Sequence, residues 1–223
     1  MSFSSETGSK RETTTSPQNK EFQNDGPFAW MQPFLNTLGF VEGSTLKGAV
    51  PTKSDGKDRV SEAEASDRRK EAADNLQNIG QDERDRRDRI GNIMLVVSAM
   101  YTVWASLIAD DGGLTGHALR ALLALPLFFA TGFKLSAQEG LWNVAQAGLW
   151  DVDGNGLSQI DDPNLARFIL NKVNAMNAET AIKVIAPVTV FAILPQSSSA
   201  PLVAFSLLFA ALYVVKDKIP TNP

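Results

Sequence analysis

Residues 90–109 read IGNIMLVVSAMYTVWASLIA and contain no charged side chain. A helix of about 20 apolar residues is long enough to cross the hydrocarbon core of a bilayer. A buried helix of a water-soluble protein rarely runs so far without one charge. This stretch therefore predicts a transmembrane helix, and it decides the interpretation of the rest of the chain.

A second apolar stretch, HALRALLALPLFFATGFKL at residues 117–135, follows a turn rich in glycine and aspartate. Its middle is uncharged. Arg120 and Lys134 stand near its two ends, where long side chains can reach the membrane surface. Pro126 is compatible with a membrane helix as a kink. We therefore expect a transmembrane hairpin over residues 90–135.

Two shorter apolar segments occupy residues 181–195 and 201–215. Each is shorter than the ideal span, which tilting or local thinning of the bilayer can accommodate. Together they predict a second transmembrane hairpin over residues 179–218, followed by a short tail at 219–223. The alternative is that both segments pack as buried helices on the first hairpin.

The basic residues follow the pattern of four spans. Short loops rich in Lys and Arg stay on the cytoplasmic side. Such residues precede the first span, separate the second from the third, and follow the fourth, whereas the turns on the other side are poor in them. This predicts both termini and the central connection on the cytoplasmic or stromal side. A bacterial inner membrane and a thylakoid both suit an N-terminus without a secretory signal.

The first 89 residues are polar and rich in charge. Residues 1–26 predict a disordered tail, because they contain too little apolar surface to offset the entropy of ordering. Residues 27–50 include an aromatic, helix-spaced segment that either docks on a membrane or partner, or packs on the protein itself. Residues 51–89 favour a charged helical arm with many i,i+4 ion pairs.

Composition excludes several kinds of chemistry. The chain has no cysteine and one histidine, His117. Thiolate zinc sites, iron–sulfur clusters and cysteine nucleophiles are therefore excluded, and we expect a protein that is not an enzyme. A transporter or channel is the weaker alternative, because no ionisable residue lies near the centre of a span.

One motif carries chemistry, the twelve residues DVDGNGLSQIDD at 151–162. The short oxygen-bearing side chains and Gly156 stand at the spacing of the calcium loop of the EF-hand family, which this segment resembles. The resemblance implies metal ligands at six positions: the side chains of Asp151, Asp153, Asn155, Gln159 and Asp162, and the backbone carbonyl of Leu157.

The flanking sequence extends the resemblance to a helix–loop–helix over residues 136–178. Residues 141–150 fit an entering helix, and Asp162 followed by Pro163 fits the N-cap of an exiting one. Aspartate replaces the usual glutamate at the last position, which weakens calcium binding or favours magnesium. Ser158 replaces the apolar residue that pairs two such loops, so pairing would come from another copy or be absent. The alternative is a glycine-rich connection that binds no metal.

The sequence thus predicts an all-α, polytopic membrane protein with four spans in two hairpins. We expect Ca²⁺, with Mg²⁺ as the alternative ion, to bind its central loop in a regulatory or scaffolding role. The alternative is an accessory or assembly subunit of a larger membrane complex, with a loop that binds no metal. The expected partners are the lipid bilayer and other membrane subunits, and a homo-oligomer is compatible. Nucleic acid is not expected, because acidic residues interrupt every basic run.

Overall fold

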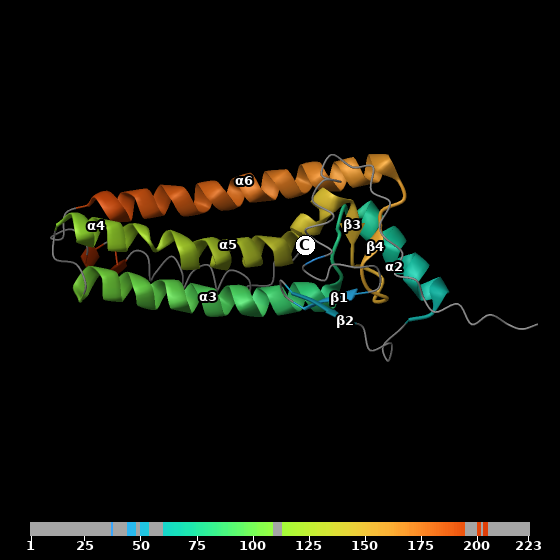
Figure 1. Cartoon of the computed structure of the whole chain (residues 1–223), viewed down its shortest axis with the longest axis horizontal. Coiled ribbons are helices and arrows are strands. Elements are labelled where there is room, and N and C mark those ends of the chain that lie inside the picture. Colours follow the sequence, from blue (N-terminus) through green and yellow to red (C-terminus); the bar gives the residue numbers. More distant parts are fainter. Residues whose placement is uncertain are drawn as a thin grey trace, which may run out of the picture.

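The computed structural model describes residues 37, 44–47, 50–53, 60–108, 113–194, 200, 201, 203 and 204. These residues are mostly helical (Figure 1), which confirms the helical class. The α-helices are α2 (Glu62–Asp74), α3 (Gln81–Leu107), α4 (Leu114–Ala121), α5 (Ala124–Glu139) and α6 (Pro163–Ile193). A 3₁₀ helix, η2, covers Asn143–Ala147.

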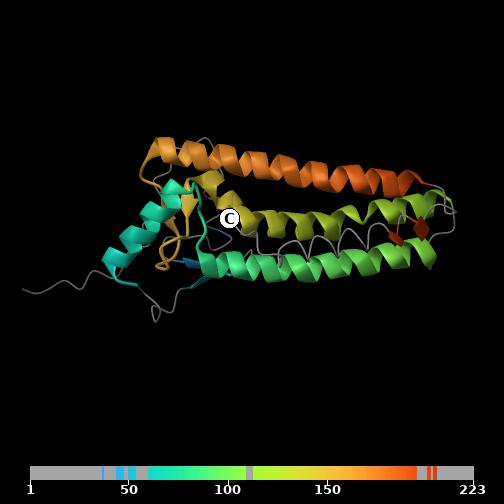
Figure 2. The same cartoon turned by 180° about the vertical axis from the view of Figure 1, so that it is seen from behind.

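The long helices form an elongated layer that we call the shaft, made of α3, α4, α5 and α6. Helix α5 lies between α3 and α6, as the two opposite views agree (Figures 1 and 2). Within the described residues, three helical stretches are long and apolar enough to cross a membrane: Gln81–Leu107, Leu114–Glu139 and Pro163–Ile193.

The second predicted span is interrupted by a turn between α4 and α5. The backbone N–H of Leu125 bonds the carbonyl of Leu122, which closes a tight turn where α5 begins. Pro126 then occupies the first turn of α5, where its missing N–H leaves no helical hydrogen bond unmade. The proline therefore starts a helix instead of kinking the middle of one.

Helix α6 joins two segments that the sequence separated. The exiting helix of the central loop and the third predicted span form one continuous helix of 31 residues, Pro163–Ile193, with Pro187 inside it. The expected boundary at residue 178 does not exist as a break. The fourth predicted span, 201–215, lies outside the described residues except for 201, 203 and 204. Val203 is buried at the far end of the shaft, in a cluster with residues of α3 and α6.

The charged arm is two helices instead of one. Helix α2 ends at Asp74, and α3 begins at Gln81 and runs without interruption into the first apolar span. Asn78, which is fully buried, holds the connection between them. Its side chain donates to the carbonyl of Trp142 and accepts from the N–H of Trp142, and its own N–H donates to the carbonyl of Gly140.

Two short antiparallel hairpins qualify the all-α prediction. Strands β1 (Ser44–Lys47) and β2 (Val50–Lys53) pair with each other across the expected boundary at residue 50. Strands β3 (Leu149–Trp150) and β4 (Ser158–Gln159) pair around the acidic loop. Both hairpins lie at the end of the shaft where α2 lies (Figure 1).

Candidate functional site

The acidic loop sits in a folded unit at one end of the shaft, which we call the cap, residues 60–80 and 140–162. The N–H of Asp151 donates to the carbonyl of Asn78, and the N–H of Gly80 donates to the carbonyl of Asp151. The N–H of Ile160 donates to the carbonyl of Gly148. The loop is thus anchored at both ends by backbone bonds to parts of the chain that the sequence motif does not include.

The entering helix predicted at residues 141–150 is wrong. Helix α5 ends at Gly140 in the left-handed region, with φ of 66°, and η2 ends the same way at Gly148, with φ of 70°. Only glycine adopts this conformation without strain. The two glycines therefore replace a continuous helix with a short 3₁₀ turn followed by β3.

The loop strand has backbone partners within the chain. Ser158 lies opposite Trp150 in the β3–β4 pair, and the N–H of Leu157 donates to the carbonyl of Ser44 in β1 at 2.7 Å. These contacts do not involve a second loop of the same kind, so pairing with the loop of another copy stays a prediction.

Two of the predicted ligand positions, Asp153 and Asn155, contact each other in the first half of the loop. Asp151 and Asp153 are 8% and 3% exposed. The N–H of Asn155 donates to Oδ1 of Asp153 at 2.8 Å. Oδ1 of Asn155 is buried and has no hydrogen-bond partner among the described residues. An orphaned buried oxygen beside carboxylates is the arrangement that an added cation would satisfy.

The second half of the loop does not complete this arrangement. Leu157 is buried, Gln159 is half-buried on β4, and Oδ1 of Asp162 accepts the N–H of Asn164 at 2.8 Å as the N-cap of α6. Across the described residues, no three His, Asp or Glu side chains gather closely enough to hold a metal ion. In the part of the chain that the structure describes, the loop therefore offers the Asp153 carboxylate and the unpartnered Oδ1 of Asn155 as oxygen donors, but no complete set of metal ligands.

Two arginines of α2, which the sequence reading did not assign to the loop, lie beside it. Nη1 of Arg69 is 3.6 Å from Oδ2 of Asp153, and Arg69 also pairs with Glu62. The Nη1 atom of Arg68 would lie only 3.0 Å from a Cβ placed on Gly154. A buried carboxylate needs a compensating charge, and here α2 supplies it. The arginines of the charged arm were the only feature of the sequence that could have indicated this contact. Nothing in their pattern indicated that they lie beside the acidic loop.

The surface of the shaft is the second candidate site, because large apolar side chains point outward from it. They include Met100 at 68% exposed, Phe128 at 50% and Ile185 at 62%, one from each long helix. The fuller set is Ile93, Val96, Leu107, Ile108, Leu122, Leu125, Phe129, Ile182, Val190 and Ile193.

The shaft interior combines apolar side chains with a few hydroxyl groups. Ser98, Thr102, Thr131 and Thr180 are buried, and the hydroxyls of Ser98, Thr102 and Thr180 each donate to a carbonyl one turn earlier in the helix. Within the described part of the shaft, apolar side chains therefore lie outside as well as inside, whereas the outside of a water-soluble bundle is mostly polar.

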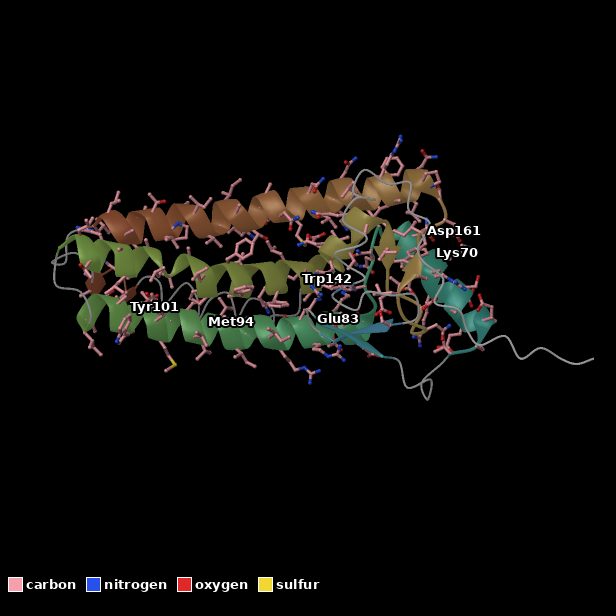
Figure 3. All side chains as sticks on the ribbon, viewed as in Figure 1. Lys70, Glu83, Met94, Tyr101, Trp142 and Asp161 are labelled. Atoms are coloured by element: carbon pink, nitrogen blue, oxygen red, sulfur yellow. The ribbon has the colours of Figure 1, made fainter. Side chains whose placement is uncertain are left out.

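At the cap end, a cation–π contact of Arg87 joins the shaft to the cap. Glu83 pairs with the buried Arg87 at 2.8 Å, and the guanidinium lies 4.5 Å from the centre of the Trp142 ring. Figure 3 shows Glu83 and Trp142 at this end, with Lys70 and Asp161 farther out on the cap. Trp150 is buried in one apolar cluster of the cap, and Trp142 packs against another.

The expectation that Arg120 and Lys134 extend outward is wrong. Both are buried, at 0% and 1% exposed. Lys134 reaches across to α3 and pairs with Asp88 at 2.5 Å. Arg120 donates to the carbonyl of Leu194 at the end of α6, at 2.5 Å. Each cation finds oxygen partners inside the bundle, which offsets the cost of its burial.

Comparisons of this chain with protein-family models, with curated proteins and with solved structures give no match.

Proposed function

We propose that this chain is an integral helical membrane protein that holds a folded cap at one membrane surface. The observation that carries the proposal is the outward apolar face of the three long helices, combined with charged groups gathered at the cap end. Met100, Phe128 and Ile185 would each be at least half exposed to water, and large exposed apolar patches are rare on soluble proteins. In a bilayer, the same apolar side chains would contact the apolar lipid tails instead of water.

Helix lengths agree with this placement. A helix rises 1.5 Å per residue, so roughly 20 residues cross the core of a bilayer. Helix α3 has 27 residues, which leaves its charged first turns outside that core. The cap would lie on the cytoplasmic or stromal side, because the arginines that precede the apolar part of α3 mark that side. The membrane itself would be a bacterial inner membrane or a thylakoid.

The role that fits this arrangement is non-catalytic: a scaffolding, regulatory or assembly subunit that presents the cap to other membrane proteins. Asn78 and Arg87 support this role. Asn78 joins the two segments of the cap through its bonds to Trp142, and Arg87 of α3 donates to Ser136 of α5 while its guanidinium lies 4.5 Å from the centre of the Trp142 ring of the cap. A cap so fixed has a defined orientation to the membrane. The lipid bilayer and neighbouring membrane subunits are the partners that we propose, and a homo-oligomer is compatible.

Membrane fractionation tests the first part of this proposal. After lysis without detergent, the chain should sediment with membranes, stay there through a carbonate wash at high pH, and dissolve in mild detergent. Recovery in the supernatant before detergent is added would rule out a membrane-spanning protein.

A second function, calcium binding by the cap, is favoured by the orphaned Oδ1 of Asn155 beside Asp151 and Asp153. These residues would hold Ca²⁺, or Mg²⁺ in its place. Gln159 and the carbonyl of Leu157 are the further ligands implied by the resemblance. Asp162 would contribute only if its side chain left the N-cap of α6.

Terbium luminescence tests this second function, because a tryptophan close to a bound Tb³⁺ ion sensitises its emission and Trp150 directly precedes the loop. We expect calcium-displaceable emission from the purified protein. Asp153→Ala should abolish it, and Asp161→Ala should preserve it, since Asp161 is an exposed acid of the same loop at a position outside the ligand set. Equal emission from both variants would show that terbium binds surface acids and not the loop.

A further inference from the structure

We propose that a second copy of the chain packs against the outward face of α6, and that Glu179 and Lys183 of the two copies pair with each other there. This pairing rests on the proposed function, a helical membrane protein, and names one of its partners and the surface that this partner covers. The starting point is an ion pair that lies where the other long helices expose apolar side chains.

The ion pair joins Glu179 and Lys183, one turn apart on α6, at 2.6 Å. Their side chains are 51% and 39% exposed, so the pair lies on the outside of the shaft. Helix α6 forms an edge of the shaft, because α5 lies between it and α3 (Figures 1 and 2). The side of α6 that carries the pair therefore faces away from the described part of the shaft.

The depth of the pair follows from the contacts of α6 with α5, which runs in the opposite direction. A Cβ on Gly132 would meet Cγ2 of Thr180 at 3.7 Å, so these two residues lie at the same level. Lys183 comes one turn after Thr180, at the level of the exposed Phe129. It also stands about 15 Å before Ile193, the last residue of α6, at 1.5 Å per residue. The pair thus lies within the apolar length of the shaft.

Helix α3 exposes a different surface along the same length of the shaft. Ile93, Val96 and Met100 are exposed there, and residues 90–107 contain no charged side chain. Such a surface suits lipid, whereas charged side chains within membrane helices almost always face the interior of a bundle or a water-filled cavity. Because the pair on α6 faces outward from one copy, we infer that a second protein surface covers it.

A second copy suits this face because the face is complementary to itself. In a two-fold pair, a residue i that contacts j also has its own j contacted by i, so Glu179 of each copy meets Lys183 of the other. The two residues differ in depth by about 6 Å, which their long side chains can span. Ala175 and Ala186 stand one turn before and after the pair and are exposed, and small side chains let membrane helices approach closely.

The test measures association of the full chain in liposomes, by energy transfer between copies labelled with donor and acceptor dyes at Ser66→Cys. Residue 66 is exposed on α2, and the chain has no cysteine of its own. Glu179→Lys creates a copy with two bases, and Lys183→Glu creates a copy with two acids. Each variant alone should associate at least about tenfold more weakly than the wild type, because like charges would meet.

A mixture of these two variants should regain most of the wild-type affinity, since opposite charges meet again. The matched control is Arg167→Glu, which reverses a charge at an exposed position of α6 nearer the cap. It should change the affinity less than about twofold.

The outcomes separate this pairing from the proposed function. Loss in each single variant with recovery in the mixture supports the pairing. Transfer that survives both charge reversals, or a loss that the mixture does not restore, overturns it. Wild-type copies that sediment with membranes but show no transfer at any ratio of protein to lipid overturn the second copy and leave the membrane-spanning protein standing. Recovery of the chain in the supernatant before detergent is added overturns both.

Discussion

Gly91 shows at the scale of one residue how closely α3 and α5 approach. A Cβ at this position would lie 2.8 Å from Cγ of Lys134 and 3.2 Å from its backbone nitrogen. The lysine stem crosses α3 at this glycine before its ammonium group reaches Asp88. The absence of a side chain at residue 91 is therefore what lets a buried lysine join the two helices.

Gly91→Ala should destabilise the protein by about 2 kcal/mol, because the backbone of Lys134 cannot move away from the added methyl group. The matched control is Gly132→Ala, where the new Cβ would meet only Cγ2 of Thr180 at an ordinary 3.7 Å. That control should be neutral or gain up to about 1 kcal/mol from helix propensity. Thermal unfolding in micelles measures both, and equal midpoints for the two variants would contradict the close approach.

Single residues of the loop also show how much of its structure could be predicted from the sequence. Asp151, Asp153 and Asn155 were predicted as neighbours, and the structure shows a contact between Asp153 and Asn155, which their local spacing allows. Asp162 was predicted both as a ligand and as an N-cap, and the structure shows the cap. Arg69 was not predicted at the loop, since a contact between residues 84 positions apart depends on how α2 packs.

At the scale of elements, apolar periodicity predicted the helices well and their ends poorly. Residues 90–107 of the predicted span lie within α3, Ile108 is its C-cap, and residue 109 lies outside the described residues. The helix begins at Gln81, nine residues before the predicted span. The charged residues before the apolar span gave no indication that they belong to the same helix. The 141–150 helix failed because Gly140 and Gly148 adopt a left-handed conformation that apolar spacing does not reveal.

Asp162 provides a test at the element scale. Asp162→Ala removes the N-cap of α6 and should cost about 1 kcal/mol, whereas Asp162→Asn keeps an oxygen acceptor for the N–H of Asn164 and should cost little. Denaturation without divalent cations measures this difference. If the asparagine variant were as unstable as the alanine variant, the charge of Asp162 and not its capping bond would be its contribution.

At the scale of the whole molecule, the sequence predicted a helical protein with apolar spans, and the described residues contain three helical stretches long and apolar enough to be spans. What it did not predict is the cap, in which α2, η2 and the β3–β4 hairpin come together over long sequence separations. Local patterns specify helices, but the polar contacts of Asn78 and Arg87 that orient the cap are visible only once distant segments are placed.

The central claim, that the outward apolar face of the shaft lies in lipid, is tested most directly by spin labels on single cysteines. The chain has no cysteine of its own, so each label occupies one chosen position. Labels at Met100, Phe128 and Ile185 report on the shaft, and labels at Ser66 and Asn171 report on exposed positions near the cap.

In liposomes, the three shaft labels should relax with oxygen, which concentrates in the bilayer, and should be shielded from a water-soluble nickel chelate. The labels at Ser66 and Asn171 should show the reverse. If the shaft labels met the nickel chelate as readily as the cap labels, the shaft would lie in water and the account would be wrong.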